Sequence, residues 1–542
     1  MRQMKKIMTL CALVCLAFSA KAVDANYNVI PLPQKIELNK SAGAFKLDNT
    51  VKIVYQGGKD LKRNAHFLAD YVKEGVGLTL PVAGKASKGK VIVVKADLKD
   101  ANHEAYKITV TDNSVTINGA SAAGAFYGVQ TLRKALPQES ASEVSLPLGQ
   151  IYDYPRFGYR GGMLDCGRHF FTVDEVKNYI DILALHNINQ FHWHLSEDQG
   201  WRIEIKKYPN LTKVGAWRKR CDIVSGDTVA DPQPYGGFYT QAQAKEIVKY
   251  AADRYVNVIP EIDMPGHMTA ALASYPNLGC TGGPYEVRST WGVMADVLCA
   301  GNDQTIAFIK EVLNELMDIF PSKYIHVGGD ECPKANWEKC PKCQARIKSL
   351  GIVSDGKHSA ETLLQNYITE TAYKTISKRG RRMIGWDEVL DGNISNNIII
   401  MSWRGTKGGI AGARKGNDVL MTPTSYCYFD FYQSNDHSTE PKAIGGYLPV
   451  STVYSFEPMP QELTAEQQKH ILGPQENLWT EFIATMPHVE YMVLPRIDAM
   501  CEVQWTNPER KNYDDFKARV PHMMKIYDKK GWKYAKHILT EK

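Results

Sequence analysis

From residue 159 onward, short apolar runs alternate with longer stretches of helical periodicity, in the repeated order strand, loop, helix. Helical spacing is clear, for example, at 173–186, 242–254, 304–320 and 360–377. The connection between the sixth and seventh strands is short, and a long irregular stretch, roughly 423–470, precedes the eighth. Eight such units predict an α/β protein built on a (β/α)8 TIM barrel. Its strands are expected at 159–164, 190–195, 256–262, 324–328, 382–386, 398–403, 419–422 and 476–479.

A different pattern precedes the barrel. Apolar alternation predicts strands at 51–55, 90–94, 106–110 and 114–117, with helices at 61–74 and 122–136. This order indicates a small α/β sandwich without a cluster of catalytic residue types, so a structural or docking role is expected. A last helix near 513–529 is expected to pack on the outside of the barrel. The expected domains are an N-terminal α/β domain at 23–152, a catalytic barrel at 153–510 and a C-terminal helix segment at 511–542.

The first 22 residues have the pattern of a signal peptide. Arg2, Lys5 and Lys6 precede an apolar run at 7–20, and Ala20-Lys21-Ala22 offers a small-x-small cleavage site. The run is short for a membrane-spanning helix, and no later stretch is long and apolar enough, so no transmembrane segment is expected. Export to the periplasm or the medium is predicted. A lipid anchor at Cys15 is less favoured, because the preceding Val14 is too large for that cleavage motif.

Composition narrows the classes of partner. The 542-residue chain is 44% hydrophobic and 23% charged, as expected of a globular protein, and its net charge of +6 is modest and dispersed. Because no basic run is present, nucleic acid is not an expected partner. The 10 Trp and 28 Tyr suit a carbohydrate ligand, since flat sugar faces stack on aromatic rings.

Nine cysteines follow the signal segment, and an odd number leaves at least one thiol unpaired. Cys280 and Cys299 flank one loop and could pair. Cys332, Cys340 and Cys343 lie close in sequence, and Cys340-x-x-Cys343 has the spacing of a zinc-ligand pair. No fourth ligand follows at standard spacing, so a disulfide with one spare thiol is expected there, and no bound metal.

The stretch that the barrel chemistry depends on is 324–331. It is expected to form a short buried strand that ends in two glycines and two adjacent carboxylates, Asp330 and Glu331. Barrel enzymes hold their chemistry at the carboxyl ends of the strands. Residues at these ends are expected to meet there, and three tryptophans around acidic groups predict an apolar pocket with polar contacts. The set comprises Asp165, Arg168, His192, His194, Glu197, Asp198, Asp263, His267, Asp330, Glu331, Trp386, Asp387, Glu388, Trp403, Arg404, Tyr428, Asp430, Trp479 and Glu481.

Adjacent strand residues point to opposite sides, so Asp330 and Glu331 are not expected to face each other across a glycosidic bond. This favours a mechanism in which the substrate supplies the nucleophile. A 2-acetamido oxygen can attack the anomeric carbon to form an oxazolinium ion. Such a reaction needs a proton donor, a carboxylate for the amide nitrogen and an apolar box for the acetyl group.

The chain resembles glycoside hydrolase family 20, the β-N-acetylhexosaminidases, of the exported bacterial type. The resemblance is carried in order through the barrel by LDCGRHFF at 164–171, FHWHLSEDQGWR at 191–202, PEIDMPGH at 260–267, HVGGDE at 326–331, GWDE at 385–388 and LWTE at 478–481. It implies an exo-acting, retaining glycosidase without a cofactor, which removes terminal β-linked GlcNAc or GalNAc from glycans. The N-terminal unit resembles the α/β domain that accompanies this family.

The resemblance also implies roles for single residues. Glu331 is expected to be the general acid and then the base, with a pKa raised toward working pH by a neighbouring carboxylate and partial burial. His267 supports Glu331 and is linked to Glu197, where relatives often have Asp. The remaining expected contacts are Asp330 to the acetamido nitrogen, Tyr428 to its carbonyl oxygen, Trp386, Trp403 and Trp479 around the acetyl group, Arg168 and Glu481 to O3 and O4, and Asp430 to O4 or O6.

Two other classes of protein remain open. His192-x-His194 at a strand end could bind zinc with His267 and Asp198, as in barrel metallohydrolases. Imidazoles that hydrogen-bond to barrel carboxylates are the favoured alternative, since a zinc site gives the acidic and aromatic residues no role. A barrel that binds glycans without cleaving them is the second class, although both Asp330 and Glu331 are present. The preference between GlcNAc and GalNAc and the oligomeric state stay open.

Overall fold

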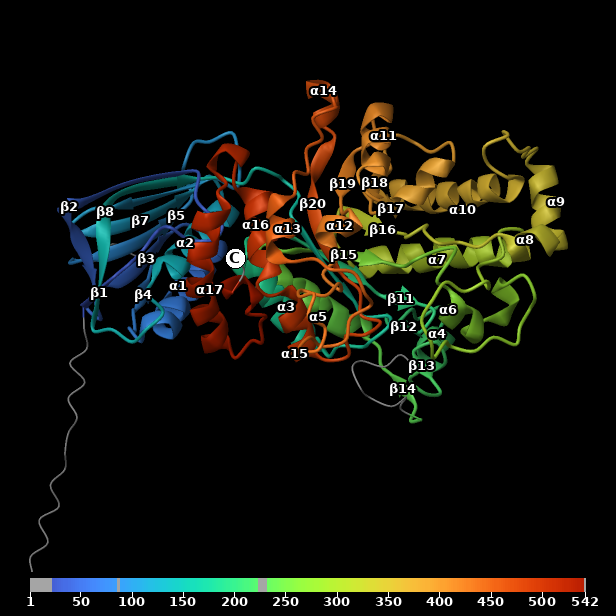
Figure 1. Cartoon of the computed structure of the whole chain (residues 1–542), viewed down its shortest axis with the longest axis horizontal. Coiled ribbons are helices and arrows are strands. Elements are labelled where there is room, and N and C mark those ends of the chain that lie inside the picture. Colours follow the sequence, from blue (N-terminus) through green and yellow to red (C-terminus); the bar gives the residue numbers. More distant parts are fainter. Residues whose placement is uncertain (1–21, 85–87, 223–231, 541–542) are drawn as a thin grey trace, which may run out of the picture.

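The computed structural model describes residues 22–84, 88–222 and 232–540. The predicted signal peptide, except for its final Ala22, lies outside these residues. Figure 1 shows an N-terminal sheet beside a barrel, with the C-terminal helix α17 between them. No helix in the described ranges is both long and apolar enough to cross a bilayer.

Eight parallel strands form a closed barrel, which confirms the predicted fold. Its interior is filled by side chains such as Ile259, Met401 and Leu420, all fully buried. Because all eight strands are parallel, their carboxyl ends lie at the same mouth of the barrel. In barrel order the strands are β9 (Gly161–Asp165), β10 (Gln190–His194), β15 (Asn257–Glu261), β16 (Tyr324–His326), β17 (Arg382–Trp386), β18 (Ile399–Ser402), β19 (Val419–Met421) and β20 (Ile471–Leu478).

Amphipathic helices surround the barrel, and several begin at the caps that their sequence encodes. The capping boxes Thr172 with Glu175 and Thr240 with Gln243 start α3 and α5. The longer helices are α3 (Val173–Leu185), α5 (Gln241–Ala252), α7 (Asp303–Ile319), α9 (Pro341–Ser349), α10 (Ala360–Ser377), α11 (Lys407–Lys415), α15 (Met486–Val493) and α16 (Arg496–Trp505). Shorter helices lie in the loops: α4 (Asn210–Lys213), α6 (Thr269–Ser274), α8 (Ala335–Lys339), α12 (Thr424–Cys427), α13 (Val450–Ser455) and α14 (Ala465–Gln468).

Most strand boundaries lie within two residues of the prediction, and two of the differences have identifiable reasons. β20 begins at Ile471 rather than near 476, because Gly473 and Pro474 interrupt the apolar pattern of a strand that continues through them. β16 ends at His326 rather than at Gly328, because Gly328 and Gly329 have φ of 66° and 106° and turn the chain out of the strand.

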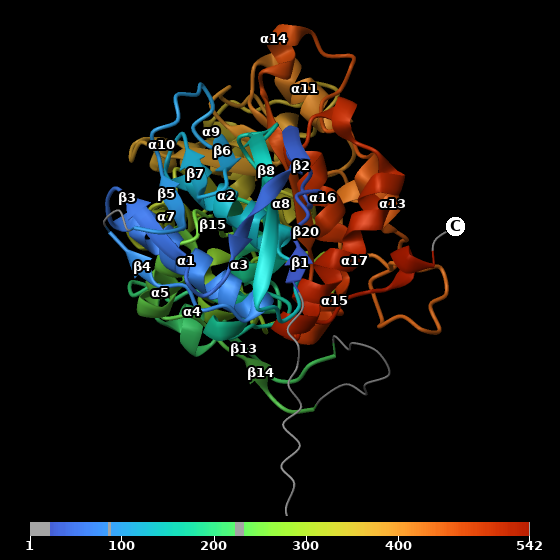
Figure 2. The ribbon, with the colours of Figure 1, turned by 90° about the vertical axis from the view of Figure 1, so that its left-hand side faces the viewer.

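The N-terminal unit is a mixed sheet covered on one face by α1 (Lys59–Val76) and α2 (Ala122–Ala135). Its strands are β1 (Ala22–Asp24), β2 (Lys35–Leu47), β3 (Lys52–Gln56), β4 (Val82–Ala83), β5 (Val91–Lys95), β6 (Tyr106–Val110), β7 (Ser114–Gly119) and β8 (Glu143–Asp153). Figure 2 shows the long β8 and β2 crossing this sheet, and neither strand is among those predicted. Their alternation is interrupted by Gly43 in β2 and by Pro147 and Gly149 in β8.

This unit docks on the end of the barrel opposite the mouth. Arg160, just before β9, forms an ion pair with Glu104 at 2.7 Å, and the Trp505 indole donates to Asp153 at 3.0 Å. Helix α17 (Tyr513–Lys530) also contacts both units, since Arg519 binds Glu502 at 2.8 Å and His522 lies 2.7 Å from the Lys134 carbonyl oxygen. The predicted last helix is therefore present, but it lies between the two units.

Candidate active site

A cavity of about 350 Å³ opens at the carboxyl ends of the barrel strands. All eleven predicted site residues line it: Arg168, Glu197, His267, Asp330, Glu331, Trp386, Trp403, Tyr428, Asp430, Trp479 and Glu481. The structure adds residues that the motifs did not single out, including Trp291, Val293 and Phe431. Trp291 lies in the irregular loop at 280–299, which contains none of the motifs quoted above, so no sequence pattern singled it out.

Asp330 and Glu331 are placed by a strained loop, not by a strand. Glu331 itself has a φ of 42°, in a region that side chains rarely adopt. At Gly328, an added Cβ would lie 1.6 Å from Asp263 Oδ1, so only glycine fits. The expectation that strand alternation separates the two carboxylates is therefore wrong, because the strand ends earlier. They differ instead in depth, since the Asp330 side chain is 12% exposed and the Glu331 side chain is 39% exposed.

His267 joins the paired carboxylates to a buried acidic layer. Its Nε2 lies 3.5 Å from Glu331 Oε2 and 3.8 Å from Asp330 Oδ2. Its Nδ1 lies 2.7 Å from Glu197 Oε1, as the sequence predicts, and 3.4 Å from Asp198 Oδ2. Burial disfavours the imidazolium, but Glu197, Asp198 and Glu331 together outweigh burial and raise the pKa of His267 well above its usual value.

This imidazolium changes the expected order of the two pKa values. Its hydrogen bond lowers the pKa of Glu331 below 4.5, so the predicted upward shift is wrong for the open pocket. The neighbouring carboxylate, Asp330, is the one that burial shifts upward, to a pKa of about 6. Desolvation still raises the pKa of Glu331, but the hydrogen bond and charge of His267 outweigh it while the side chain is 39% exposed.

Four aromatic side chains form one wall and the floor of the cavity. The rings of Trp386 and Trp479 lie 5.8 Å apart, and Trp403 stacks on Tyr428 with centroids 6.3 Å apart. Hydrogen bonds fix two of the indoles, from Trp386 Nε1 to Glu261 at 3.1 Å and from Trp403 Nε1 to Glu388 at 3.0 Å. Trp386 is 1% exposed and packs on the His326 ring of the barrel interior, so it closes the floor.

Polar groups complete the opposite side. Arg168 is held by Asp165 at 3.0 Å and lies 3.5 Å from Glu481, with its guanidinium over the Trp479 ring. Buried oxygens of Asp330, Asp430 and Glu481 have no hydrogen-bond partner within the described protein. An unpaired buried carboxylate oxygen is costly, so these atoms are suited to the hydroxyl and amide groups of a ligand.

Beneath the floor, Glu261 organises an interior network that sequence reasoning missed. His192 Nε2 lies 2.9 Å from Glu261, His194 Nδ1 makes a very short contact with it, and His326 lies 2.8 Å away. Burial raises the pKa of Glu261, but the imidazoles outweigh burial and hold it well below its usual range. A charged residue in the otherwise apolar strand at 257–262 was the signal for this position.

These contacts bear on the predicted zinc alternative. His192 and His194 share a carboxylate partner, as the favoured alternative predicts, whereas His267 binds Glu197 and Asp198. Among the described residues, His192, His194 and the pair of His267 and Asp198 fall into three different clusters. They are therefore not arranged around one ion.

A barrel with paired carboxylates in an aromatic pocket at its mouth is the arrangement of a glycoside hydrolase. Residues 157–508 match the catalytic domain of glycosyl hydrolase family 20, and residues 26–154 match domain 2 of that family. The chain therefore belongs to glycosyl hydrolase family 20, and the resemblance stated above is confirmed.

Named relatives agree with this placement. A β-hexosaminidase of Porphyromonas gingivalis is 43% identical over 97% of this chain and 67% of that protein. A β-N-acetylhexosaminidase of Cellulomonas fimi is 30% identical over 93% of this chain and 95% of its own length. The structure of a family 20 exo β-N-acetylglucosaminidase from Vibrio harveyi with N-acetylglucosamine has a TM-score of 0.82 and 32% identity, and covers 95% of this chain and 79% of that chain.

Proposed function

We propose that this chain is an exo-acting β-N-acetylhexosaminidase that removes terminal β-linked GlcNAc or GalNAc from the non-reducing ends of glycans. The observation that carries the proposal is the pairing of half-exposed Glu331 with buried Asp330 beside the aromatic box of Trp386, Trp403 and Trp479. This arrangement offers one proton donor to the leaving group. It also offers a carboxylate to a group inside the box, which suits an acetamido substituent.

The reaction retains configuration through two inversions at the anomeric carbon. Glu331 gives its proton to the glycosidic oxygen while the acetamido carbonyl oxygen of the sugar attacks that carbon. Asp330 accepts the amide N–H and stabilises the oxazolinium ion that forms, and Tyr428 donates to the acetamido oxygen. Water then attacks the anomeric carbon while Glu331 removes a proton from this water. The oxazolinium ring opens, which restores the acetamido group and leaves the sugar hemiacetal.

Proton placement on the pair is the main electrostatic requirement. The reactive form has Glu331 protonated and Asp330 ionised, whereas the open pocket favours the opposite order. A bound sugar would change the pKa values of both carboxyl groups. It would exclude water from Glu331, and its N–H would stabilise the Asp330 carboxylate. The pair therefore titrates as a unit whose proton moves toward Glu331 on binding.

The sugar hydroxyls would be held at the inner end of the pocket. Arg168 and Glu481 are placed to bind O3 and O4, and Asp430 to bind O4 or O6. Glu388 lies behind Trp403, where burial raises its pKa to about 8, and it orients that indole by accepting its N–H. A floor closed by Trp386 leaves no path for a chain to continue beyond its terminal sugar, which supports exo action.

The proposal is tested by release of nitrophenol from the β-N-acetylglucosaminide, with the β-glucoside and a thiazoline inhibitor in parallel. Cleavage of the N-acetyl substrate alone, blocked by the thiazoline, is the expected result. Cleavage of the plain glucoside would contradict the acetamido nucleophile. Binding to a glycan array without cleavage would favour a glycan-binding barrel.

We also propose that the chain is exported to the periplasm or the medium, on the pattern of its first 22 residues. The test is fractionation of the producing cells, with N-terminal sequencing of the isolated protein. A mature chain that begins at Val23 is expected. A cytoplasmic protein with an intact N-terminus would contradict export.

A further inference from the structure

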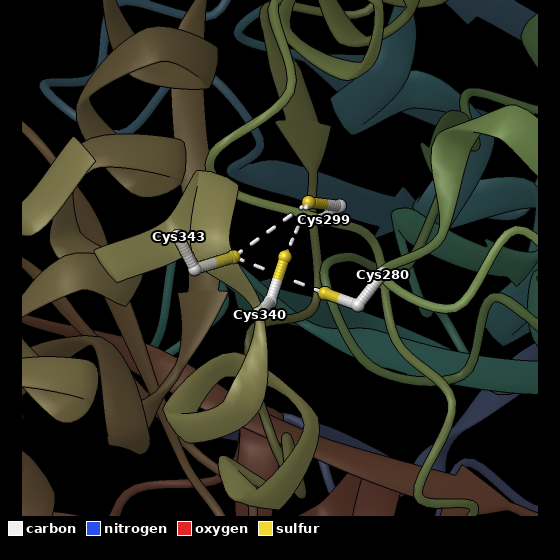
Figure 3. Close-up of side chains that lie close together, drawn as sticks. All are labelled: Cys280, Cys299, Cys340 and Cys343. Carbon is white, nitrogen blue, oxygen red and sulfur yellow. Dashed lines mark hydrogen bonds between the residues drawn. The ribbon is translucent and has the colours of Figure 1, made fainter. Parts of the chain in front are cut away.

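Four cysteine side chains from two separate chain segments point toward one another, as Figure 3 shows. Cys280 and Cys299 lie at the two ends of a loop between α6 and α7, whereas Cys340 and Cys343 lie at the start of α9. The sulfur of Cys299 is 3.6 Å from that of Cys343 and 3.7 Å from that of Cys340, and Cys280 is 3.8 Å from Cys343. All four sulfurs lie within 4.8 Å of one another.

This cluster corrects the sequence prediction for the cysteines. No disulfide is present among the described cysteines, and Cys332 is outside the cluster. The predicted disulfide within the group Cys332, Cys340 and Cys343 is therefore wrong. The two ligands that sequence spacing did not reveal are Cys280 and Cys299, which come from a loop 60 and 41 residues before Cys340.

The distances match those of a tetrahedral metal thiolate. With Zn–S bonds of about 2.3 Å, neighbouring sulfurs of a tetrahedron lie roughly 3.8 Å apart. Three of the sulfur pairs are 3.6–3.8 Å apart, close to this value, and no pair exceeds 4.8 Å. They are almost twice the length of an S–S bond, about 2.05 Å.

The surroundings fix the sulfurs in place. Cys299 and Cys343 are fully buried, and Cys340 is 5% exposed. Gly301 lets the loop press directly on α9, since a Cβ there would lie 2.1 Å from the Lys342 carbonyl carbon. The Trp337 indole of α8 donates to the Leu298 carbonyl at 2.9 Å and joins the two segments beside the cluster.

The electrostatic setting also suits thiolates. Pro341 starts α9, so Cys340 caps its N-terminus and Cys343 is in its first turn, where the helix dipole favours negative charge.

We propose that Cys280, Cys299, Cys340 and Cys343 bind one Zn²⁺ ion as four thiolates. The four thiols release four protons when the ion binds, and no redox step is involved. A closed set of four sulfur ligands leaves no position for water, so the site is structural rather than catalytic. The argument for this ion does not rest on the proposed glycosidase activity, and it replaces the expectation that the chain binds no metal.

The ion would fasten one wall of the substrate pocket. A bridge between Gly279 and Leu298 closes the neck of the loop, and its far end brings Trp291 and Val293 to the pocket rim. The other two ligands follow Glu331 by only nine and twelve residues, through α8 into α9. Removing the ion is therefore expected to raise KM more than it lowers kcat.

The first test is the metal content of the full-length protein purified without chelators, by mass spectrometry. One equivalent of zinc is expected in the wild-type protein. Cys340→Ser and Cys343→Ser should lose it, whereas the matched variant Cys332→Ser, which removes a thiol outside the cluster, should keep it. Absence of zinc, or zinc that persists in both cluster variants, would overturn the proposal.

A second test uses the wild-type chain alone, in case the cluster variants fail to fold. After denaturation with EDTA, all four cysteines should react with iodoacetamide without a reductant. Reaction only after reduction would show two disulfides and overturn the proposal. Refolding with Co²⁺ should give the visible absorption of a tetrahedral thiolate, and its absence would count against the site.

Discussion

Glu261 and Asp330 are both buried acidic residues, but their hydrogen-bond partners and the directions of their pKa shifts are opposite. Glu261 is surrounded by His192, His194, His326 and the Trp386 indole, and its pKa is held well below the usual range. Asp330 has a buried oxygen without a partner, and its pKa is raised to about 6. The interior carboxylate is hydrogen-bonded by protein groups and stabilises the fold. The carboxylate at the mouth keeps an unpaired oxygen that a ligand can bind.

The largest expected effect is on catalysis at the mouth. Glu331→Gln should lower kcat by roughly 10²–10⁴-fold, the usual contribution of a general acid and base. Asp330→Asn should lower it by about 10²–10³-fold, because charge stabilisation is lost. With a very good leaving group the Glu331→Gln loss should be partly hidden, but the Asp330→Asn loss should not. The Tm of the Asp330→Asn variant should be unchanged or slightly higher, since Asp330 is a buried carboxylate with an unpaired oxygen. Unchanged rates with purified variants would contradict these roles.

Replacing Glu261 should reduce stability more than catalysis. Glu261→Gln removes the charge that balances the neighbouring imidazoles, and breaking such a buried pair costs roughly 3–5 kcal/mol of folding free energy. Denaturant unfolding measures this loss. Activity per folded molecule should fall less than in the Asp330 variant, because Glu261 is separated from the substrate by Trp386. A fully stable variant would show that the interior network has little structural value.

His267 connects the two layers, and its replacement should move the pH dependence of kcat/KM. The imidazolium lowers the pKa values of both Glu331 and Asp330, so its removal in His267→Asn raises both. Both limbs of the profile should therefore move to higher pH, with a lower maximum. Asp430→Asn is the matched control, since its carboxyl group is coupled to Glu481 and not to the pair. It should lose rate without moving the limbs, and a downward shift in His267→Asn would refute this explanation.

The smallest effect is expected at the rim. Trp291 is 50% exposed and packs edge-on against Phe482 with ring centroids 5.9 Å apart. An aromatic contact of this kind with the sugar beyond the cleaved bond would contribute about 0.5–1.5 kcal/mol. Trp291→Ala should raise KM for a disaccharide roughly two- to ten-fold and leave kcat nearly unchanged. The nitrophenyl substrate is the comparison, because its small leaving group makes less of this contact. Equal changes for both substrates would argue against a sugar contact.

The barrel and the composition of its mouth were predictable from the sequence because both depend on local patterns. Parallel strands bring their carboxyl ends together, so short motifs such as those ending in Asp330-Glu331 and Trp479-Thr480-Glu481 were enough to assemble the pocket. The role of Glu261 was harder to predict, since its three imidazole partners come from two other strands.

What could not be predicted depends on the path of the chain between elements. The four-cysteine cluster needs the loop at 280–299 to return to α9, and no ligand spacing encodes that return. The lowered pKa of Glu331 depends first on the charged His267 beside it, and second on a side chain that stays 39% exposed, and no sequence motif reveals either. The late start predicted for β20 arose because Gly473 and Pro474 resemble a loop in sequence.

The closed floor at Trp386 has a consequence for the breakdown of a long glycan. Only chain ends can enter such a pocket, so the rate at which a polymer disappears depends on the number of its ends and not on its mass. Every internal cut made by another enzyme creates a new end of this kind. This protein should therefore degrade polymers much faster in a mixture with endo-acting hydrolases than by itself. The rate on short oligosaccharides should not depend on such enzymes.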